Sequence, residues 1–97
     1  MAKIFDDIRV RLKSLGFSTV EYPNDFLEFY GSRADSTGQM FSVEGSLEVG
    51  ESGEISYSVV YSTEDWESDA FIGTFHAPVD VNAVVDYIAT PEFVEAS

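Results

Sequence analysis

Two neighbouring segments of this chain alternate between apolar and polar residues, and this alternation constrains the fold more than any other feature of the sequence. Over residues 41–49 and 55–61 the odd positions are apolar or aromatic, with Gly45 as the exception. The even positions hold Ser and Glu, apart from Val60. A period of two is typical of β-strands with one buried face, so both segments are predicted to be strands of a sheet.

The alternation also predicts how these two strands pair. Cross-strand neighbours share a face, so odd positions must pair with odd positions. A three-residue loop, Glu51-Ser52-Gly53, meets this condition and places Gly53 where such a loop needs a left-handed residue. The predicted core-side partners are Val49 with Ile55, Leu47 with Tyr57 and Val43 with Tyr61. The opposite face then carries Glu48 beside Ser56 and Glu44 beside Val60.

Amphipathic helices are predicted on both sides of the strands. Between Ala2 and Leu15 apolar side chains recur every three or four residues, and Gly16 followed by an apolar residue is typical of a helix C-terminus. After the last strand, Asp80 is the predicted N-cap of a second helix. The buried side of this helix is predicted to carry Val81, Val84, Val85 and Ile88. Thr90 is a predicted cap for a short final helix from Pro91 to Glu95.

Three shorter segments complete the predicted sheet. They are Ser18 to Tyr22, Phe26 to Tyr30 and Ala70 to Phe75, with a turn at residues 23–25, a flexible loop from Gly31 to Gly38 and an acidic loop from Thr63 to Ser68. We therefore expect a single acidic α+β domain over residues 1–97, with an N-terminal helix, an antiparallel meander of four to five strands and a C-terminal helix. Both helices are expected on one face, which leaves the Glu and Ser face open.

The charge of the chain is distributed unevenly. Sixteen of the eighteen carboxylates lie from Glu21 onward, where Arg33 is the only basic residue, and the net charge is −13 at pH 7. The other four basic residues fall in the first helix, where they are interpreted as a solvated face. Uncompensated charge destabilises a compact fold, and a net charge of about 2–8 already keeps a small domain soluble. We therefore predict an acidic surface that meets a basic partner; a general acidic coat, including one adapted to high salt, is the alternative.

Composition narrows the range of partners and locations. The chain has no Cys, which excludes disulfides, thiol catalysis and Cys-based metal sites and fits a reducing cytoplasm. No apolar run approaches the roughly 20 residues of a membrane span, and Asp6 and Asp7 interrupt any signal-peptide core. Nucleic acids and anionic lipids bind through clustered Lys and Arg, so direct binding to either is not expected.

Residues capable of catalysis or metal binding do not form a recognised pattern. The sole histidine, His76, has no accompanying nucleophile signature and is interpreted as structural or surface-exposed. Asp65, Glu67 and Asp69 share the spacing of the first EF-hand ligands. However, the sixth position is Ala70 instead of Gly, and the twelfth is His76 instead of Glu. We predict no catalytic residue, no metal site and no cofactor, and hence a protein that is not an enzyme.

The predicted binding residues follow from the acidic character of the strands and loops. Glu44 and Glu48 lie about 13 Å apart along one strand face, and this row approaches the phosphate spacing of a nucleic acid only if other carboxylates fold alongside. Trp66, flanked by acidic residues, is either a buried cover of the sheet end or an aromatic anchor inside an anionic rim. The predicted partner-binding set is Glu28, Glu44, Glu48, Glu51, Glu54, Glu64, Asp65, Trp66, Glu67 and Asp69.

In size, acidity and small α+β layout, the chain resembles phage-encoded inhibitors of bacterial defence, namely anti-CRISPR proteins and other nucleic-acid mimics. The resemblance concerns the overall properties of the whole chain. It assigns no residue roles, because those inhibitors share no motif. It implies a stoichiometric inhibitor in the cytoplasm of a bacterial host cell, which neutralises Lys and Arg in the groove of a nucleic-acid-binding complex such as a CRISPR effector. An immunity protein that neutralises a basic nuclease toxin is the alternative.

Overall fold

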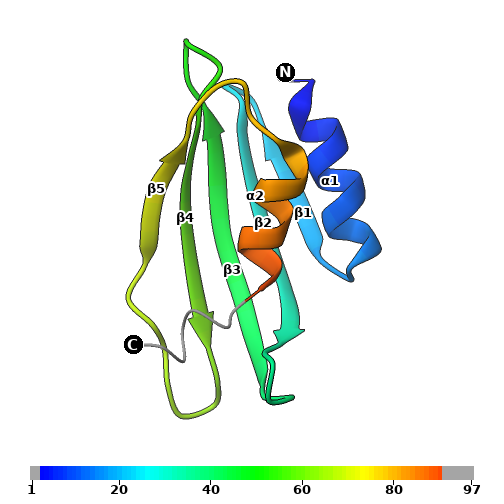
Figure 1. The fold of residues 1–97 in the computed structure, drawn as a ribbon, viewed down its shortest axis with the longest axis vertical. Helices are drawn as coiled ribbons and strands as arrows, with labels where there is room; N and C mark the ends of the chain where they lie inside the picture. The colour runs from blue at the N-terminus through cyan, green and yellow to red at the C-terminus, as the bar shows by residue number, and fades with distance from the viewer. Residues whose placement is uncertain (1–2, 91–97) are drawn as a thin grey trace.

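The computed structural model describes residues 3–90, which form an α+β fold as predicted (Figure 1). Five antiparallel strands make one sheet in the order β1-β2-β3-β4-β5, so each strand pairs with its neighbours in the sequence. The elements are α1 (Ile4–Ser14), β1 (Ser18–Tyr22), β2 (Phe26–Ala34), β3 (Met40–Val49), β4 (Ile55–Ser62), β5 (Phe71–Phe75) and α2 (Val81–Ala89). The predicted helix from Pro91 to Glu95 lies outside the described residues.

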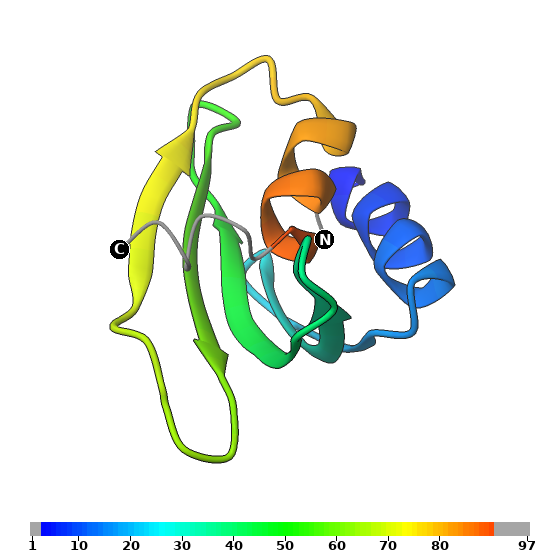
Figure 2. The same ribbon diagram turned by 60° about the horizontal axis from the view of Figure 1, so that its bottom comes forward.

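Both helices cover the same face of the sheet, and the other face carries no helix (Figures 1 and 2). The core lies between these layers because the odd positions of the strands and the apolar stripes of the helices point toward one another. Its fully buried side chains include Phe5, Ile8, Leu12, Leu27, Val43, Leu47, Ile55, Val59, Tyr61, Val84 and Ile88. The two-layer arrangement therefore leaves the even-numbered strand residues on the uncovered side.

The pairing of β3 with β4 confirms the predicted register. Val49 lies opposite Ile55, Leu47 opposite Tyr57 and Val43 opposite Tyr61. In the connecting loop, Gly50 N–H donates to the Glu54 carbonyl over 2.8 Å, and Gly53 has a φ of +81°. The left-handed conformation at Gly53 explains why a three-residue loop closes this hairpin.

The first helix ends where the sequence predicts. Gly16 has a φ of +93°, and the Phe17 N–H donates to the Leu12 carbonyl over 2.9 Å. This arrangement is common at helix C-termini, because it satisfies carbonyls that have no partner within the helix. Phe17 is buried immediately after this turn, so it anchors the start of β1 against the core.

The expected flexible loop from Gly31 to Gly38 is wrong in its first half, because β2 continues to Ala34. Ser32 pairs with Ser42 and Arg33 with Phe41, so this part of the chain is held by the β3 ladder. The remaining loop is closed by the buried Asp35, whose Oδ1 accepts hydrogen bonds from the Thr37 N–H over 2.9 Å and the Gln39 N–H over 3.0 Å. An aspartate that bonds backbone groups two and four residues ahead makes a compact turn.

The second helix is held at both ends. At its start, Asp80 Oδ1 accepts from the Asn82 N–H over 2.9 Å, as expected of an N-cap. At its end, the Tyr61 hydroxyl donates to the Tyr87 and Ile88 carbonyls over 3.1 and 3.3 Å, and Arg33 Nε donates to the Ala89 carbonyl over 3.2 Å. Two side chains from the sheet therefore satisfy carbonyls at the C-terminal end of α2.

Candidate binding surface on the open face of the sheet

The uncovered side of the sheet, named here the open face, is formed by the even-numbered strand residues. The register places them in rows that cross the strands. The central row is Val20, Glu28, Ser46, Ser58 and Ile72, and the rows on either side are Ser18, Tyr30, Glu44 and Val60, and Tyr22, Phe26, Glu48, Ser56 and Thr74. Toward the far ends of the strands lie Ser32, Ser42 and Ser62, followed by Ala34 and Met40.

Three carboxylates of the open face surround one serine. Glu28 on β2 lies directly opposite Ser46 on β3, and Glu44 and Glu48 are the residues two before and two after Ser46. Diagonal neighbours of this kind are about 7–8 Å apart between Cα atoms. Glu28 therefore falls between the two β3 carboxylates, on the neighbouring strand. Glu28 thus lies alongside the predicted row of Glu44 and Glu48.

The position of Glu28 is further defined by a hydrogen bond on the same face. The Tyr22 hydroxyl donates to Glu28 Oε1 over 2.7 Å, and the Tyr22 ring packs against Phe26 with their centroids 5.7 Å apart. The hydrogen bond to this carboxylate is the largest cause that raises the pKa of the Tyr22 phenol. The Glu28 carboxylate is thus oriented by a neighbour although it is exposed.

Apolar side chains are exposed between these polar groups. Val20, Tyr30, Met40 and Ile72 are 52%, 56%, 54% and 74% exposed, and all four belong to the open face. Scattered exposed apolar residues are normal on a protein surface, whereas several on one face are typical of an interaction site. The open face therefore combines negative charge with apolar contact area. None of the four belongs to the predicted partner-binding set, which consists of carboxylates and Trp66.

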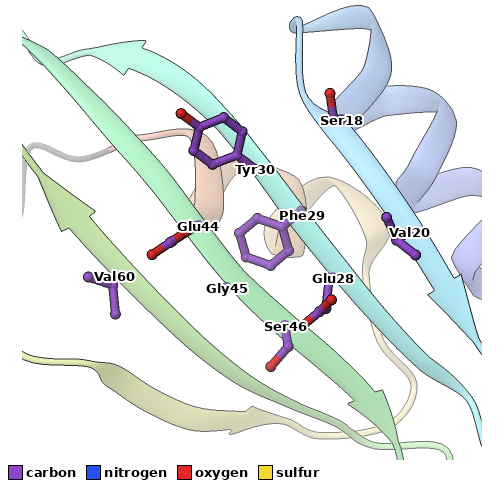
Figure 3. Close-up of a pocket in the computed structure, with 9 residues that line it drawn as sticks. All are labelled: Ser18, Val20, Glu28, Phe29, Tyr30, Glu44, Gly45, Ser46 and Val60. Atoms are coloured by element: carbon purple, nitrogen blue, oxygen red, sulfur yellow. The ribbon is translucent and has the colours of Figure 1, made fainter.

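A shallow hollow of about 510 Å³ lies on the open face across β1 to β4 (Figure 3). Tyr30, Glu44 and Val60 belong to one of the rows that border it, and Val20, Glu28 and Ser46 belong to the next. Gly45, Ser18 and Ser46 also border the hollow, and their short or absent side chains leave space between the larger ones.

The basic residues of the molecule lie on the opposite side. Lys3, Arg9, Arg11 and Lys13 belong to the segment of α1, and Arg33 points toward α2, where it bonds the Ala89 carbonyl. Arg9 is engaged by two carboxylates, at 3.1 Å from Glu21 and 3.2 Å from Asp6. The interpretation of the α1 basic residues as a solvated face is therefore incomplete, because Arg9 also ties the helix to β1. Among the described residues, none of the open face carries a positive charge.

The remaining predicted binding residues lie at the two ends of the sheet. Glu51 and Glu54 belong to the β3–β4 loop, and Glu54 Oε1 accepts from the Ser52 N–H over 3.0 Å. Glu64, Asp65, Glu67 and Asp69 lie between β4 and β5, at the other end of β4 (Figure 1). At about 3.3 Å per residue, the eight residues of β4 separate these loops by roughly 23 Å. The predicted set thus consists of three open-face carboxylates and two loops flanking them.

Trp66 lies in the β4–β5 loop and is 43% exposed. Its ring stands edge-on to Phe41, with the centroids 6.2 Å apart, and its carbonyl accepts from the Thr63 N–H over 2.7 Å. Phe41 points into the core, so Trp66 covers one edge of the core while part of its ring remains accessible. The interpretation of Trp66 as a buried cover is therefore wrong in its burial, although the contact with Phe41 is present; the role of an aromatic anchor stays a prediction.

Elsewhere in the described part of the chain, the acidic residues and His76 do not form a metal site. Residues 3–90 hold no group of three His, Asp or Glu side chains arranged to bind a metal ion. His76 is exposed beyond β5 and borders a hollow that also includes Ser52 and Glu54. Within the same residues, neither helix is long and apolar enough to span a membrane.

Comparisons with known proteins add no identification. A scan against protein-family models, a search of curated proteins and a search of solved structures each return no match to this chain. Its functional assignment therefore depends on the physical character of the open face.

Proposed function

We propose that this protein is a stoichiometric inhibitor whose acidic open face occupies the basic nucleic-acid-binding groove of another protein, in the manner of an anti-CRISPR protein acting in the cytoplasm of a bacterial host cell. The observation that carries the proposal is the separation of charge across the sheet. The open face bears Glu28, Glu44 and Glu48 without a cation, whereas α1 and its N-cap on the far side carry four basic residues against two acidic ones.

The arrangement of the three carboxylates supports this choice of partner. A zigzag over two strands is formed by Glu44, Glu28 and Glu48, and successive Cα atoms in it are about 7–8 Å apart. A succession of anionic groups at this scale is comparable to a nucleic-acid backbone, which Lys and Arg side chains bind through its phosphates. A protein groove built to neutralise phosphates therefore offers cations at a suitable spacing.

The exposed apolar residues support a protein as the partner. Tyr30 lies directly opposite Glu44, and Ile72 lies on the same face two strands away, on β5. Both expose apolar surface that a protein partner can bury. Aromatic residues are enriched at the centres of protein interfaces, while charges steer the approach of the partners. The open face combines both features.

The proposal is tested by affinity capture from bacterial lysate at low salt, followed by a challenge with duplex DNA. The informative variant is Glu44→Lys/Glu48→Lys, which reverses two open-face charges. The matched control is Asp7→Lys/Asp86→Lys, which makes the same change in net charge at exposed positions of the two helices.

We expect wild type and control to capture a nucleic-acid-binding protein that DNA displaces, and the open-face variant to lose it. Equal capture by both variants would contradict a role for the open face. A captured protein that DNA does not displace would contradict the nucleic-acid groove, and if that protein were a nuclease toxin it would identify an immunity protein instead.

A further inference from the structure

The hollow on the open face has the chemistry of a site for one positively charged side chain. Glu28 and Glu44 border it from neighbouring strands, as diagonal neighbours about 7–8 Å apart between Cα atoms. Tyr30, directly opposite Glu44, borders it with an exposed aromatic ring, and Val20 and Val60 add apolar surface. Carboxylates, an aromatic ring and apolar surface thus meet within one hollow of about 510 Å³.

These groups are available to a partner. Within residues 3–90, neither the Glu44 carboxylate nor the Tyr30 hydroxyl takes part in a side-chain hydrogen bond or an ion pair. Glu28 accepts a hydrogen bond at Oε1 from Tyr22, and this contact defines the position of its carboxylate at the border of the hollow. A cation that enters the hollow would not have to displace an internal salt bridge.

We propose that this hollow binds the guanidinium group of a single arginine of the partner, in preference to a lysine ammonium group. A guanidinium is planar, so it stacks on the Tyr30 ring while its edges donate to carboxylates on two sides. An ammonium group is a compact, strongly hydrated point charge and gains less from an aromatic face and a partly apolar hollow. The inference rests on the proposed function and specifies the residue that anchors the partner.

Two peptides of equal charge test this preference. Both are blocked heptapeptides, Lys-Lys-Lys-X-Lys-Lys-Lys, in which X is either Arg or Lys. Affinity is measured by calorimetry at low salt, and the contact is located by ¹H–¹⁵N NMR shifts of the isotope-labelled protein. We expect the Arg peptide to bind roughly two- to fivefold more tightly, which corresponds to one cation–π contact at an exposed site. The largest shifts are expected at residues 28–30 and 44–46.

Variants assign the preference to the hollow. Tyr30→Leu and Glu44→Gln should reduce the ratio of the two affinities to about one, whereas the control Glu64→Gln, in the β4–β5 loop, should weaken both peptides equally and keep the ratio. A ratio that survives in Tyr30→Leu and Glu44→Gln would overturn the inference. Equal affinities in the wild type would overturn it while leaving the proposed function intact. Absence of binding by either peptide would overturn both.

Discussion

Phe29 lies directly opposite Gly45 in the β2–β3 pair, so closely that a Cβ on Gly45 would stand 2.9 Å from Cζ of the Phe29 ring. The same relationship occurs between Tyr57 and Gly73 on β4 and β5, where a Cβ would stand 2.5 Å from the Tyr57 hydroxyl oxygen. In both pairs an aromatic ring covers the surface of a strand glycine on the helix side. Such pairs compensate for the missing side chain and allow the sheet to bend there.

The Phe29–Gly45 pair predicts a specific cost for a small substitution. Gly45→Ala places a methyl group against the Phe29 ring and the β4 backbone, and overpacking of this kind destabilises by about 1–3 kcal/mol. The free energy of unfolding is measured by urea denaturation. Ser46→Ala, one residue along on the open face, is the control and should change it by less than about 0.5 kcal/mol. A neutral Gly45→Ala would contradict this cost, because it would require both the Phe29 ring and the Ser58 carbonyl of β4 to move aside freely.

The strands β3 and β4 were predictable from the sequence because their alternation and the position of Gly53 specify one register. The extension of β2 to Ala34 was not predictable, because a glycine such as Gly31 in a polar segment is typical of a loop. Two features distant in sequence accompany the extension: residues 31–34 pair with β3, and the Phe17 ring covers Gly31, where a Cβ would stand 2.7 Å from Cγ of Phe17. Local pattern cannot reveal a contact that the tertiary fold creates.

The candidate site was predictable to a similar degree. Glu44 and Glu48 were assigned to the open face because they alternate with core residues along β3. Tyr30 was not recognised as part of this face, because it follows another aromatic residue, Phe29, and two adjacent rings leave the facing of each undetermined. The pairing of Tyr30 with Glu44 becomes apparent only with the register of β2.

The ion pair between Arg9 and Glu21 is predicted to stabilise the contact of α1 with β1. The Glu21 side chain is only 5% exposed, and its Oε2 has no hydrogen-bond partner among the described residues. Arg9→Met leaves this carboxylate without its cation and should destabilise by about 1–3 kcal/mol, as measured by thermal or urea unfolding. Arg11→Met, on the exposed side of the helix, is the control and should have little effect.

A second substitution separates charge from packing at this site. In Arg9→Met/Glu21→Gln the uncompensated charge is removed, so most of the lost stability should return. If the double variant is as unstable as Arg9→Met alone, the loss arises from the packing of the Arg9 stem.

Tyr61 on β4 and Tyr87 on α2 predict a loss of stability at high pH. Burial raises the pKa of Tyr61 well above its usual value, and burial, together with a hydrogen bond with Tyr57, raises the pKa of Tyr87 to about 12. In the unfolded chain both titrate near pH 10. The contribution of the two neutral phenols to the free energy of unfolding is therefore fully present below about pH 10. It is lost as the pH rises from there through the pKa values of the folded state.

Urea unfolding between pH 8 and pH 11.5 measures this dependence. We expect a constant free energy of unfolding up to about pH 9.5 and a decline above it, with a shallower decline for Tyr61→Phe. Tyr61→Phe should also be less stable at pH 8, by about 1 kcal/mol, because it no longer donates to the Tyr87 and Ile88 carbonyls. An unchanged slope in Tyr61→Phe would assign the alkaline transition to other groups.

Reversal of charge on the acidic surface is predicted to abolish binding and to leave the melting temperature of the protein equal or higher. Replacing Glu44, Glu48, Glu64 and Glu67 by Lys should abolish binding to a basic partner. All four side chains are exposed, and they belong to a molecule with a net charge of −13 whose charges repel one another. The variant should therefore remain folded, with a melting temperature equal to or above that of the wild type at low salt, as followed by circular dichroism.

Added salt should narrow the difference in melting temperature, since it screens exposed charges beyond a Debye length of about 10 Å at 0.1 M. A variant that unfolds would show that these carboxylates stabilise the fold, whereas a folded variant with undiminished affinity would show that the partner binds elsewhere.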